Sequence, residues 1–356
     1  MVMEKKDVLT PKKDCSMSVV SLVKDLSMKK FNGITAVCFV DSVYSMLLYL
    51  LVYGKKQFES TYFFVSEAIS VEVQSKLKYK QFLSLHKMEA MPRLVRCIYR
   101  FLLYRTCYWH WPFLKTLPIY GHDHLWFSSA LLHKRTMVVI EDGLGNYDEK
   151  WLIKPQLRKH KKLLQFIYGP NIVKGDYGLT DQAKEVVLTE LASIPECLKS
   201  KAKIVNVQDL WKKSDAKDYI TSLFGITDDD LLMLAEKKVI ILTQPYNIQI
   251  GDDNLIEIYR KIIDKYNSEE VVIKTHPRDN LDYEKAFPGV KVYSKKVPAE
   301  LFALLGIHFD DVYTINSTSI YSFPPPQSNL HYLGVKCHPK LIELYGQDTI
   351  EGLAQN

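Results

Sequence analysis

The feature that most constrains the fold of this chain is a repeated alternation of short apolar segments with amphipathic ones. Apolar runs such as residues 34–40, 136–140 and 271–274 are a few residues long and rich in Val and Ile, as buried strands are. Residues 252–266 carry apolar side chains at helical spacing instead. Strands that alternate with helices form parallel sheets covered on both faces, so the sequence predicts an α/β fold.

The alternation divides into two sets. The predicted strands cover residues 34–40, 62–65, 117–120, 136–140 and, more weakly, 203–207, and then 238–242, 271–274, 311–315 and 331–335. A helical segment over residues 211–234 separates the sets, which places a domain boundary near residue 235. We therefore expect a lead-in over residues 1–30, an N-terminal Rossmann-like domain over 31–235 and a C-terminal Rossmann-like domain over 236–356. A chain of 356 residues that is 47% hydrophobic is long enough for two domains.

Polar clusters follow several of these strands directly. They are Glu141-Asp142-Gly143, Thr243-Gln244, Lys274-Thr275-His276-Pro277-Arg278 and Ser317-Thr318-Ser319. Ligands of parallel sheets bind beyond the carboxyl ends of the strands. The placement of the clusters therefore predicts a site formed by strand ends of both domains.

Each cluster has a plain structural interpretation beside a chemical one. Asp142 or Glu141 can act as a general base, but Asp-Gly is also a common turn. Histidine with fixed cations suits a phosphate, but a His-Pro pair can simply end a strand. Hydroxyls such as those of Ser317 and Thr318 can hold an anion or cap a helix. No cluster decides between its two interpretations alone.

Two further segments have alternative interpretations. His122-Asp123-His124 contains metal-ligating side chains, but a polar helix start near the edge of the site is favoured, and contact with an acceptor is a third interpretation. The basic, aromatic stretch over residues 91–111 is interpreted as core packing with a cationic outer face, with contact to a membrane surface as the alternative.

The net charge and the apolar segments limit the partners and the location. The net charge of +6 suits anionic ligands, and no known nucleic-acid-binding module is recognisable. The N-terminus lacks the apolar region of a secretory signal, and the most apolar stretch, residues 43–53, is too short to span a bilayer. We therefore expect a cytoplasmic protein, with six free thiols, that does not bind nucleic acid.

The ordered set of clusters resembles the bacterial sialyltransferases of glycosyltransferase family 52. The resemblance rests on Glu141-Asp142-Gly143, Lys274-Thr275-His276-Pro277, Val297-Pro298-Ala299-Glu300-Leu301 and Ser317-Thr318. It covers most of residues 34–338. It implies a GT-B architecture with the active site in the cleft between the domains, CMP-sialic acid as donor, inversion at the anomeric carbon and no required cofactor or metal.

The resemblance also implies a role for each site residue. Asp142, with Glu141 as the alternative, would be the catalytic base, and His276 would assist the departure of CMP. The remaining donor-binding positions would be Ser317 and Thr318 at the phosphate, Lys274 and Pro277 at the cytosine, Glu300 at the ribose, and Thr243 and Gln244 nearby. Ser317-Thr318 stands where related enzymes often have a serine pair, and threonine keeps the hydroxyl.

The resemblance implies a terminal galactose of a capsular polysaccharide or lipooligosaccharide as acceptor, with peripheral contact to the inner membrane and a homodimer as further expectations. Three alternatives stay open. They are a GT-B transferase for another nucleotide sugar, a metal-dependent hydrolase built on His122, Asp123 and His124, and a non-catalytic membrane-associated scaffold that uses residues 91–111.

Overall fold

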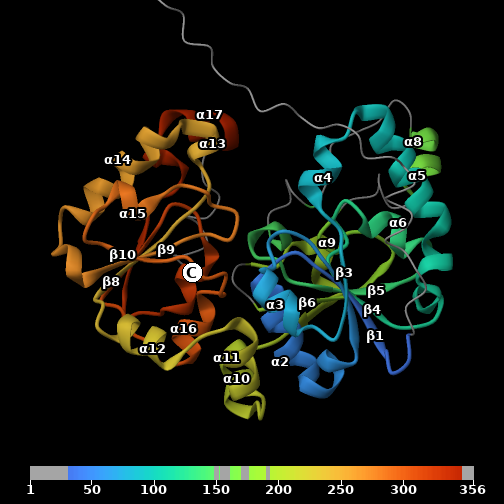
Figure 1. Cartoon of the computed structure of the whole chain (residues 1–356), viewed down its shortest axis with the longest axis horizontal. Coiled ribbons are helices and arrows are strands. Elements are labelled where there is room, and N and C mark those ends of the chain that lie inside the picture. Colours follow the sequence, from blue (N-terminus) through green and yellow to red (C-terminus); the bar gives the residue numbers. More distant parts are fainter. Residues whose placement is uncertain (1–30, 148–151, 153–160, 170–175, 190–192, 347–356) are drawn as a thin grey trace, which may run out of the picture.

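The computed structural model of the chain describes residues 31–147, 152, 161–169, 176–189 and 193–346. These residues form two lobes side by side, each built on a parallel β-sheet packed with helices (Figure 1). The predicted α/β class with two parallel sheets is confirmed, while the predicted lead-in over residues 1–30 lies outside the described residues.

The first sheet has seven strands in the order β3-β2-β1-β4-β5-β6-β7. Their bounds are β1 Ala36–Val40, β2 Thr61–Val65, β3 Tyr79–Phe82, β4 Ile119–Gly121, β5 Met137–Ile140, β6 Ala183–Leu188 and β7 Ala202–Ile204. Five of them were predicted. The sequence analysis missed β3, which is a polar strand at the edge, and β6, in which the charged pair Lys184-Glu185 follows the first residue.

The second sheet has five strands in the order β10-β9-β8-β11-β12. Their bounds are β8 Val239–Leu242, β9 Val271–Lys274, β10 Lys291–Tyr293, β11 Asp311–Thr314 and β12 Asn329–Tyr332. The predicted strand over residues 331–335 begins two residues earlier, and the short edge strand β10 was missed.

The helices that cover the two sheets are mostly short. Their bounds are α2 Val43–Glu59, α3 Val71–Lys76, α4 Leu85–Ala90, α5 Arg93–His110, α6 Ser128–Leu132, α8 Lys161–Tyr168, α9 Glu196–Lys199, α10 Val207–Lys213, α11 Lys217–Phe224, α12 Asp228–Ala235, α13 Asn247–Ile250, α14 Asp252–Ile263, α15 Tyr283–Ala286, α16 Glu300–Leu304 and α17 Pro339–Tyr345. Helices α10 and α11 pack on α2 and α3 of the first lobe, whereas Asp230 of α12 pairs with Lys295 of the second. The boundary near residue 235 stays a prediction.

Strand β1 shows how the first lobe forms its core. All five of its residues are buried, as expected for a central strand of a parallel sheet. Alternate side chains face opposite sides, so Val37 and Phe39 join one apolar cluster while Cys38 and Val40 join the other. Ser42 then caps α2 by accepting a hydrogen bond from the backbone N–H of Ser45.

The strand order places a binding crevice in each lobe. The order reverses between β1 and β4 in the first sheet and between β8 and β11 in the second. Crevices for ligands form at the carboxyl ends of strands at such reversal points. Gly121 ends β4 at φ 103°, and a Cβ there would lie 2.0 Å from the carbonyl oxygen of Phe39. Only glycine therefore allows the chain to continue from β4 into His122 so close to β1.

Helix α5 fulfils its predicted core-packing role only in part. Within the helix, Leu103 and Cys107 are buried, whereas Leu94, Ile98 and Trp109 are exposed, Trp109 by 79%. Most of its apolar surface therefore faces outward on the flank of the first lobe, where α8 packs beside it (Figure 1). Among the described residues, no helix is long and apolar enough to cross a membrane.

Candidate functional site

A cleft of about 290 Å³ opens between the carboxyl ends of the two sheets. Its lining includes nearly all of the predicted site residues, which are Asp142, Thr243, Gln244, Lys274, His276, Pro277, Glu300, Ser317 and Thr318. Glu141 is the exception, because its side chain is buried in the first lobe and does not line the cleft. The structure therefore brings together residues that lie up to 176 positions apart in the sequence.

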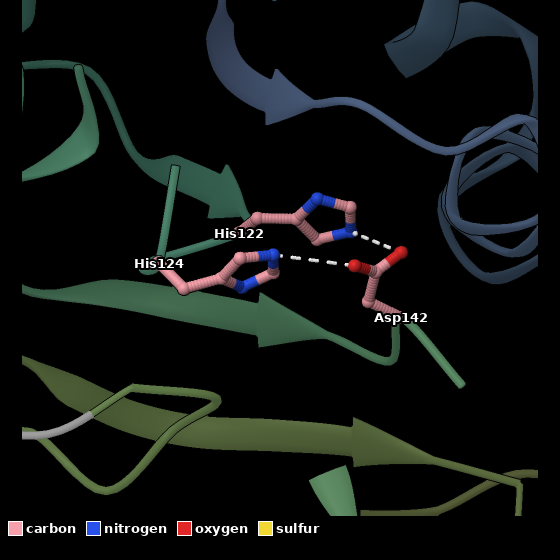
Figure 2. A group of neighbouring side chains, drawn as sticks. All are labelled: His122, His124 and Asp142. Atoms are coloured by element: carbon pink, nitrogen blue, oxygen red, sulfur yellow. Dashed lines mark ion pairs between the residues drawn. The ribbon is translucent and has the colours of Figure 1, made fainter. Parts of the chain in front are cut away.

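Asp142 directly follows β5. Its carboxylate lies beside the imidazole rings of His122 and His124, which follow β4. Figure 2 shows both rings pointing toward its carboxylate. His124 Nε2 lies 3.2 Å from Asp142 Oδ2, and His122 Nε2 lies 3.6 Å from Asp142 Oδ1. The backbone N–H of Asp142 donates to Asn146 Oδ1 at 2.8 Å, which fixes the turn after the strand. The carboxylate is thus held in one orientation at the edge of the cleft.

The two histidines have opposite protonation tendencies. Burial lowers the pKa of His122 to about 4, so this ring is neutral at neutral pH. Burial also acts to lower the pKa of His124, but the hydrogen bond and charge of Asp142, with Asp123 and Asp176 behind it, raise that pKa above its ordinary value. Of the two rings, His124 is therefore the more readily protonated beside Asp142.

The same environment sets the charge of Asp142. Burial acts to raise its pKa, but the charge of His122, the hydrogen bond and charge of His124, and the charge of Arg278 lower it to about 2. Asp142 is consequently ionised at neutral pH, beside a histidine whose pKa is raised.

Within the described part of the chain, one group of side chains could hold a metal ion. It consists of His122, His124 and Asp142, whose ligand atoms lie within 4.8 Å of one another. Asp123 does not join them, because its Oδ2 accepts the backbone N–H of Gly178 at 2.9 Å. Metal-bound histidines donate their second ring N–H to a partner, yet neither Nδ1 has one among the described residues.

The hydrogen bond of His122 to Ser45 also argues against a metal at these residues. Ser45 Oγ donates to the carbonyl oxygen of Glu141 at 2.6 Å, so it accepts from His122 Nε2, 2.9 Å away. The atom that would bind a metal therefore carries a proton. These residues fit a hydrogen-bonded acid–base group better than a metal centre.

Glu141 lies behind Asp142 in a ring of donors. Its carboxylate accepts hydrogen bonds from Tyr147 Oη at 2.6 Å, from the backbone N–H of Thr189 at 2.6 Å and from Tyr44 Oη at 3.2 Å. Burial raises its pKa to about 7 in spite of these donors. Through these hydrogen bonds Glu141 links the end of β5 to Tyr44 of α2 and to Thr189, which follows β6.

His276 faces Asp142 from the second lobe, in a turn organised by Thr243. Thr243 Oγ1 accepts the backbone N–H of His276 at 3.0 Å and donates to Asp279 Oδ2 at 2.6 Å. His276 Nδ1 accepts the backbone N–H of Arg278 at 3.1 Å, so the proton of the neutral ring is on Nε2. Burial, with the charges of Arg278 and Lys274, lowers the pKa of His276 to about 3. At neutral pH this residue is a neutral hydrogen-bond donor.

Lys274 and Glu300 form the inner wall of the cleft. Both are buried, and Lys274 Nζ donates to the carbonyl oxygen of Thr275 at 2.8 Å. Burial lowers the pKa of Lys274 to about 8, partly offset by the charge of Glu300, whose own pKa is raised by burial. Ser319 Oγ donates to Glu300 Oε1 at 2.6 Å. The wall therefore offers polar groups in a low-dielectric setting, where hydrogen bonds to a ligand are strong.

The two lobes approach each other closely at Gly143. This glycine has φ 88°, and a Cβ on it would lie 3.3 Å from Thr318 Oγ1 of the second lobe. Thr318 begins a short 3-10 helix, Thr318–Ser322, which Ser317 caps by accepting the N–H of Ser319 at 3.4 Å. The turn that carries Asp142 thus faces the hydroxyl cluster directly.

Several residues of the site were not predicted as site residues. His122 and His124 were interpreted as a helix start, although they align Asp142. Arg278 was predicted only as one of two cations suited to an anionic group, and Asp41 and Asp279 were not assigned to the site. The position of Asp41 directly after a buried strand was the signal that could have identified it. The pairing of the histidines with Asp142 depends on β4 lying beside β5, which no local pattern encodes.

Comparisons with known proteins show what this chain is similar to. The model of glycosyltransferase family 52 matches residues 49–340. An uncharacterized protein of Haemophilus influenzae is 34% identical over 242 residues, which cover 67% of this chain and 75% of that protein.

Solved structures of similar fold include two sialyltransferases. The GT-B domain of the Photobacterium damselae enzyme superposes with a TM-score of 0.50 at 14% identity, over 84% of this chain and 90% of that one. A 2,6-sialyltransferase from another Photobacterium, solved with CMP and lactose, gives 0.53 at 13% identity, over 84% and 71%. These similarities confirm the predicted GT-B fold.

Proposed function

The chain belongs to glycosyltransferase family 52, as its resemblance predicted, and from this premise we propose that it transfers sialic acid from CMP-sialic acid to a galactose hydroxyl. The observation that carries the proposal is the placement of Asp142 and His276 on facing walls of one cleft. A base and a leaving-group donor on opposite sides suit an inverting displacement. The similar 2,6-sialyltransferase was solved with CMP and lactose, a galactoside, which supports this choice of ligands.

In the proposed reaction Asp142 takes the proton of the acceptor hydroxyl as the new C–O bond forms. The bond between the anomeric carbon and the phosphate oxygen breaks, and CMP leaves with that electron pair. His276 keeps its proton and donates a hydrogen bond from Nε2–H to the departing phosphate, assisted by the hydroxyls of Ser317 and Thr318. Such donors, fixed before the reaction, stabilise charge as it develops.

The remaining predicted residues would hold the nucleotide. Lys274 and Pro277 would lie along the cytosine, and Glu300 would accept from the ribose hydroxyls. Thr243 and Gln244 lie at the end of β8, and the hydroxyl of Thr243 is already used to hold the turn of His276. We therefore assign Thr243 a positioning role rather than direct contact with the donor.

The proposal assigns no role to a metal, because His276 and the hydroxyls would carry the phosphate charge. Turnover measured after dialysis against EDTA is expected to equal that of the untreated protein. Loss of activity in EDTA, restored by added Zn²⁺ or Mn²⁺, would instead favour a metal-dependent reaction at His122, His124 and Asp142.

Nucleotide binding can be tested separately from turnover. Calorimetry is expected to show CMP binding in preference to UMP, and Glu300→Gln is expected to weaken CMP binding by about 10- to 100-fold, since hydrogen bonds to charged groups contribute roughly 1.5–3 kcal/mol. Glu343→Gln on the exposed part of α17 is the matched control and should bind CMP normally. Absence of CMP binding by the unaltered protein would contradict the proposal.

The His124–Asp142 pair predicts how transfer depends on pH. While His124 is protonated, it holds the pKa of Asp142 low and makes the carboxylate a weak base. As pH rises through the raised pKa of His124, that charge is lost and the basicity of Asp142 increases. We expect kcat/KM to rise with pH above about 6.5, the ordinary histidine value, and this rise to disappear in His124→Asn. An unchanged profile in His124→Asn would contradict this.

We also propose that α5 and α8 contact an anionic membrane surface. Helix α5 carries four arginines and no acidic residue, with apolar side chains exposed between them. Sedimentation with vesicles containing phosphatidylglycerol should capture the protein, and pure phosphatidylcholine should not. Equal capture by both vesicles, or none, would contradict an electrostatic contact. A homodimer stays a prediction.

A further inference from the structure

Arg278 is a cation of the cleft whose charge the reaction just proposed does not use. Among the described residues that line the cleft, Lys274 and Arg278 carry fixed positive charges. Lys274 is 4% exposed and donates to the backbone, whereas the Arg278 side chain is 57% exposed. A negatively charged group that enters the cleft would therefore meet the guanidinium of Arg278 first.

Arg278 reaches across the cleft to a buried aspartate of the opposite lobe. Its Nη2 lies 3.1 Å from Asp41 Oδ2, and Asp41 is 8% exposed. The other carboxylate oxygen of Asp41 accepts from Ser66 Oγ and the backbone N–H of Ala68, so Asp41 is held in place. The ion pair uses one nitrogen of the guanidinium. Nε and Nη1 form no hydrogen bond within the described part of the chain.

The position of Arg278 relates it to the reacting atoms. It lies two residues after His276 and interacts with Asp41, which follows β1 beside the β4 end that carries His122. Its charge also reaches both proposed reaction partners, because it acts to lower the pKa of Asp142 and of His276. A sugar placed between Asp142 and His276 would therefore lie near the guanidinium of Arg278, which lines the same cleft.

We infer that Arg278 binds the carboxylate of the donor sugar, and that Asp41 occupies the guanidinium when no donor is present. The inference rests on the proposed function, in which the sugar carries a carboxylate on its anomeric carbon. A guanidinium matches a carboxylate with two parallel hydrogen bonds, one from Nη2 and one from Nε or Nη1, so the carboxylate of the donor would take the place of Asp41 at Nη2. Asp41 acts as an internal competitor that keeps the arginine extended across the cleft.

The experiment compares three ligands on the full-length protein. They are CMP-sialic acid, its carboxyl methyl ester and CMP. Arg278→Gln is expected to weaken binding of CMP-sialic acid by about 10- to 100-fold, the range of a hydrogen-bonded charge pair, and to leave binding of the ester and of CMP within about twofold of the wild type. Arg278→Lys keeps the charge but cannot donate two parallel hydrogen bonds. Its affinity for CMP-sialic acid should lie between those of the wild type and Arg278→Gln.

Asp41→Asn tests the competitor directly. Removing its charge is expected to tighten binding of CMP-sialic acid by a few fold and to leave the ester unchanged. The reason is that the Arg278 side of this ion pair is solvent-exposed, and ion pairs open to solvent contribute roughly 0.2–1 kcal/mol. A purely structural ion pair predicts the opposite, with weaker binding of all three ligands in both variants. That result, or equal losses for the acid and the ester in Arg278→Gln, would overturn the inference. If the unaltered protein binds neither CMP nor CMP-sialic acid, the proposed function fails instead.

Discussion

Replacement of Asp142 by asparagine is expected to lower kcat by about 100- to 10,000-fold, the range that a general base contributes. Asparagine is nearly isosteric and can still accept from His124, so the fold and the affinity for CMP should persist. The loss follows from the missing carboxylate, since an amide cannot take the proton of the acceptor hydroxyl. The measurement is steady-state turnover, together with thermal unfolding and CMP calorimetry.

Glu141→Gln is the matched control, because Glu141 is the neighbouring acid and was the alternative base. It accepts hydrogen bonds from Tyr44, Tyr147 and Thr189 and does not line the cleft. We expect a lower melting temperature, and a turnover close to normal below that temperature. Near-normal turnover of folded Asp142→Asn, with Glu141→Gln inactive, would reverse the assignment.

Replacement of His276 by alanine is expected to lower kcat by about 100- to 1,000-fold, as the removal of one fixed donor to a developing anion does. The affinity for CMP should change little, because the donor acts on charge that appears as the phosphate leaves. His331→Ala is the control, since His331 pairs with Asp311 outside the cleft lining. Similar losses in both variants would remove His276 from the leaving-group role.

The protonation state of His276 gives a second readout. Its pKa is lowered to about 3 in the free protein, so the ring is neutral from mildly acidic to basic pH. The pH profile of kcat/KM should therefore contain no decline near pH 6.5 that is removed by His276→Ala. Such a decline would mean that His276 acts as a protonated acid in the free enzyme.

The sequence alone predicts the parts of the fold that rest on local pattern. Residues 271–274 form a strand with the predicted bounds because four consecutive buried side chains precede a polar turn. Strand β6 was missed because Lys184 and Glu185 interrupt its apolar run, although Val186–Leu188 is buried. Propensity describes single segments, whereas burial in a sheet depends on the neighbouring strands.

The candidate site likewise contains residues that the sequence predicts and contacts that it does not predict. Asp142 and His276 were predicted because each belongs to a polar cluster that follows a buried strand and because the family resemblance implies a role for each. The ion pairs that shift the pKa values of these residues were not predicted. Asp142 and His124 follow different strands, and Asp41 and Arg278 lie in different lobes. The contact between Arg278 and Asp41 spans 237 positions. Their geometry comes from tertiary packing, which the motifs do not encode.

The central claim is the identity of the donor, and the most direct measurement is a donor screen read by product mass. The protein is incubated with lactose and, in separate reactions, with CMP-sialic acid and with UDP-linked and GDP-linked sugars. The account predicts release of CMP and a lactose product heavier by one sialic acid residue in the CMP-sialic acid reaction, and no product in the others. Turnover of a UDP-linked or GDP-linked sugar, with CMP-sialic acid left intact, would contradict it.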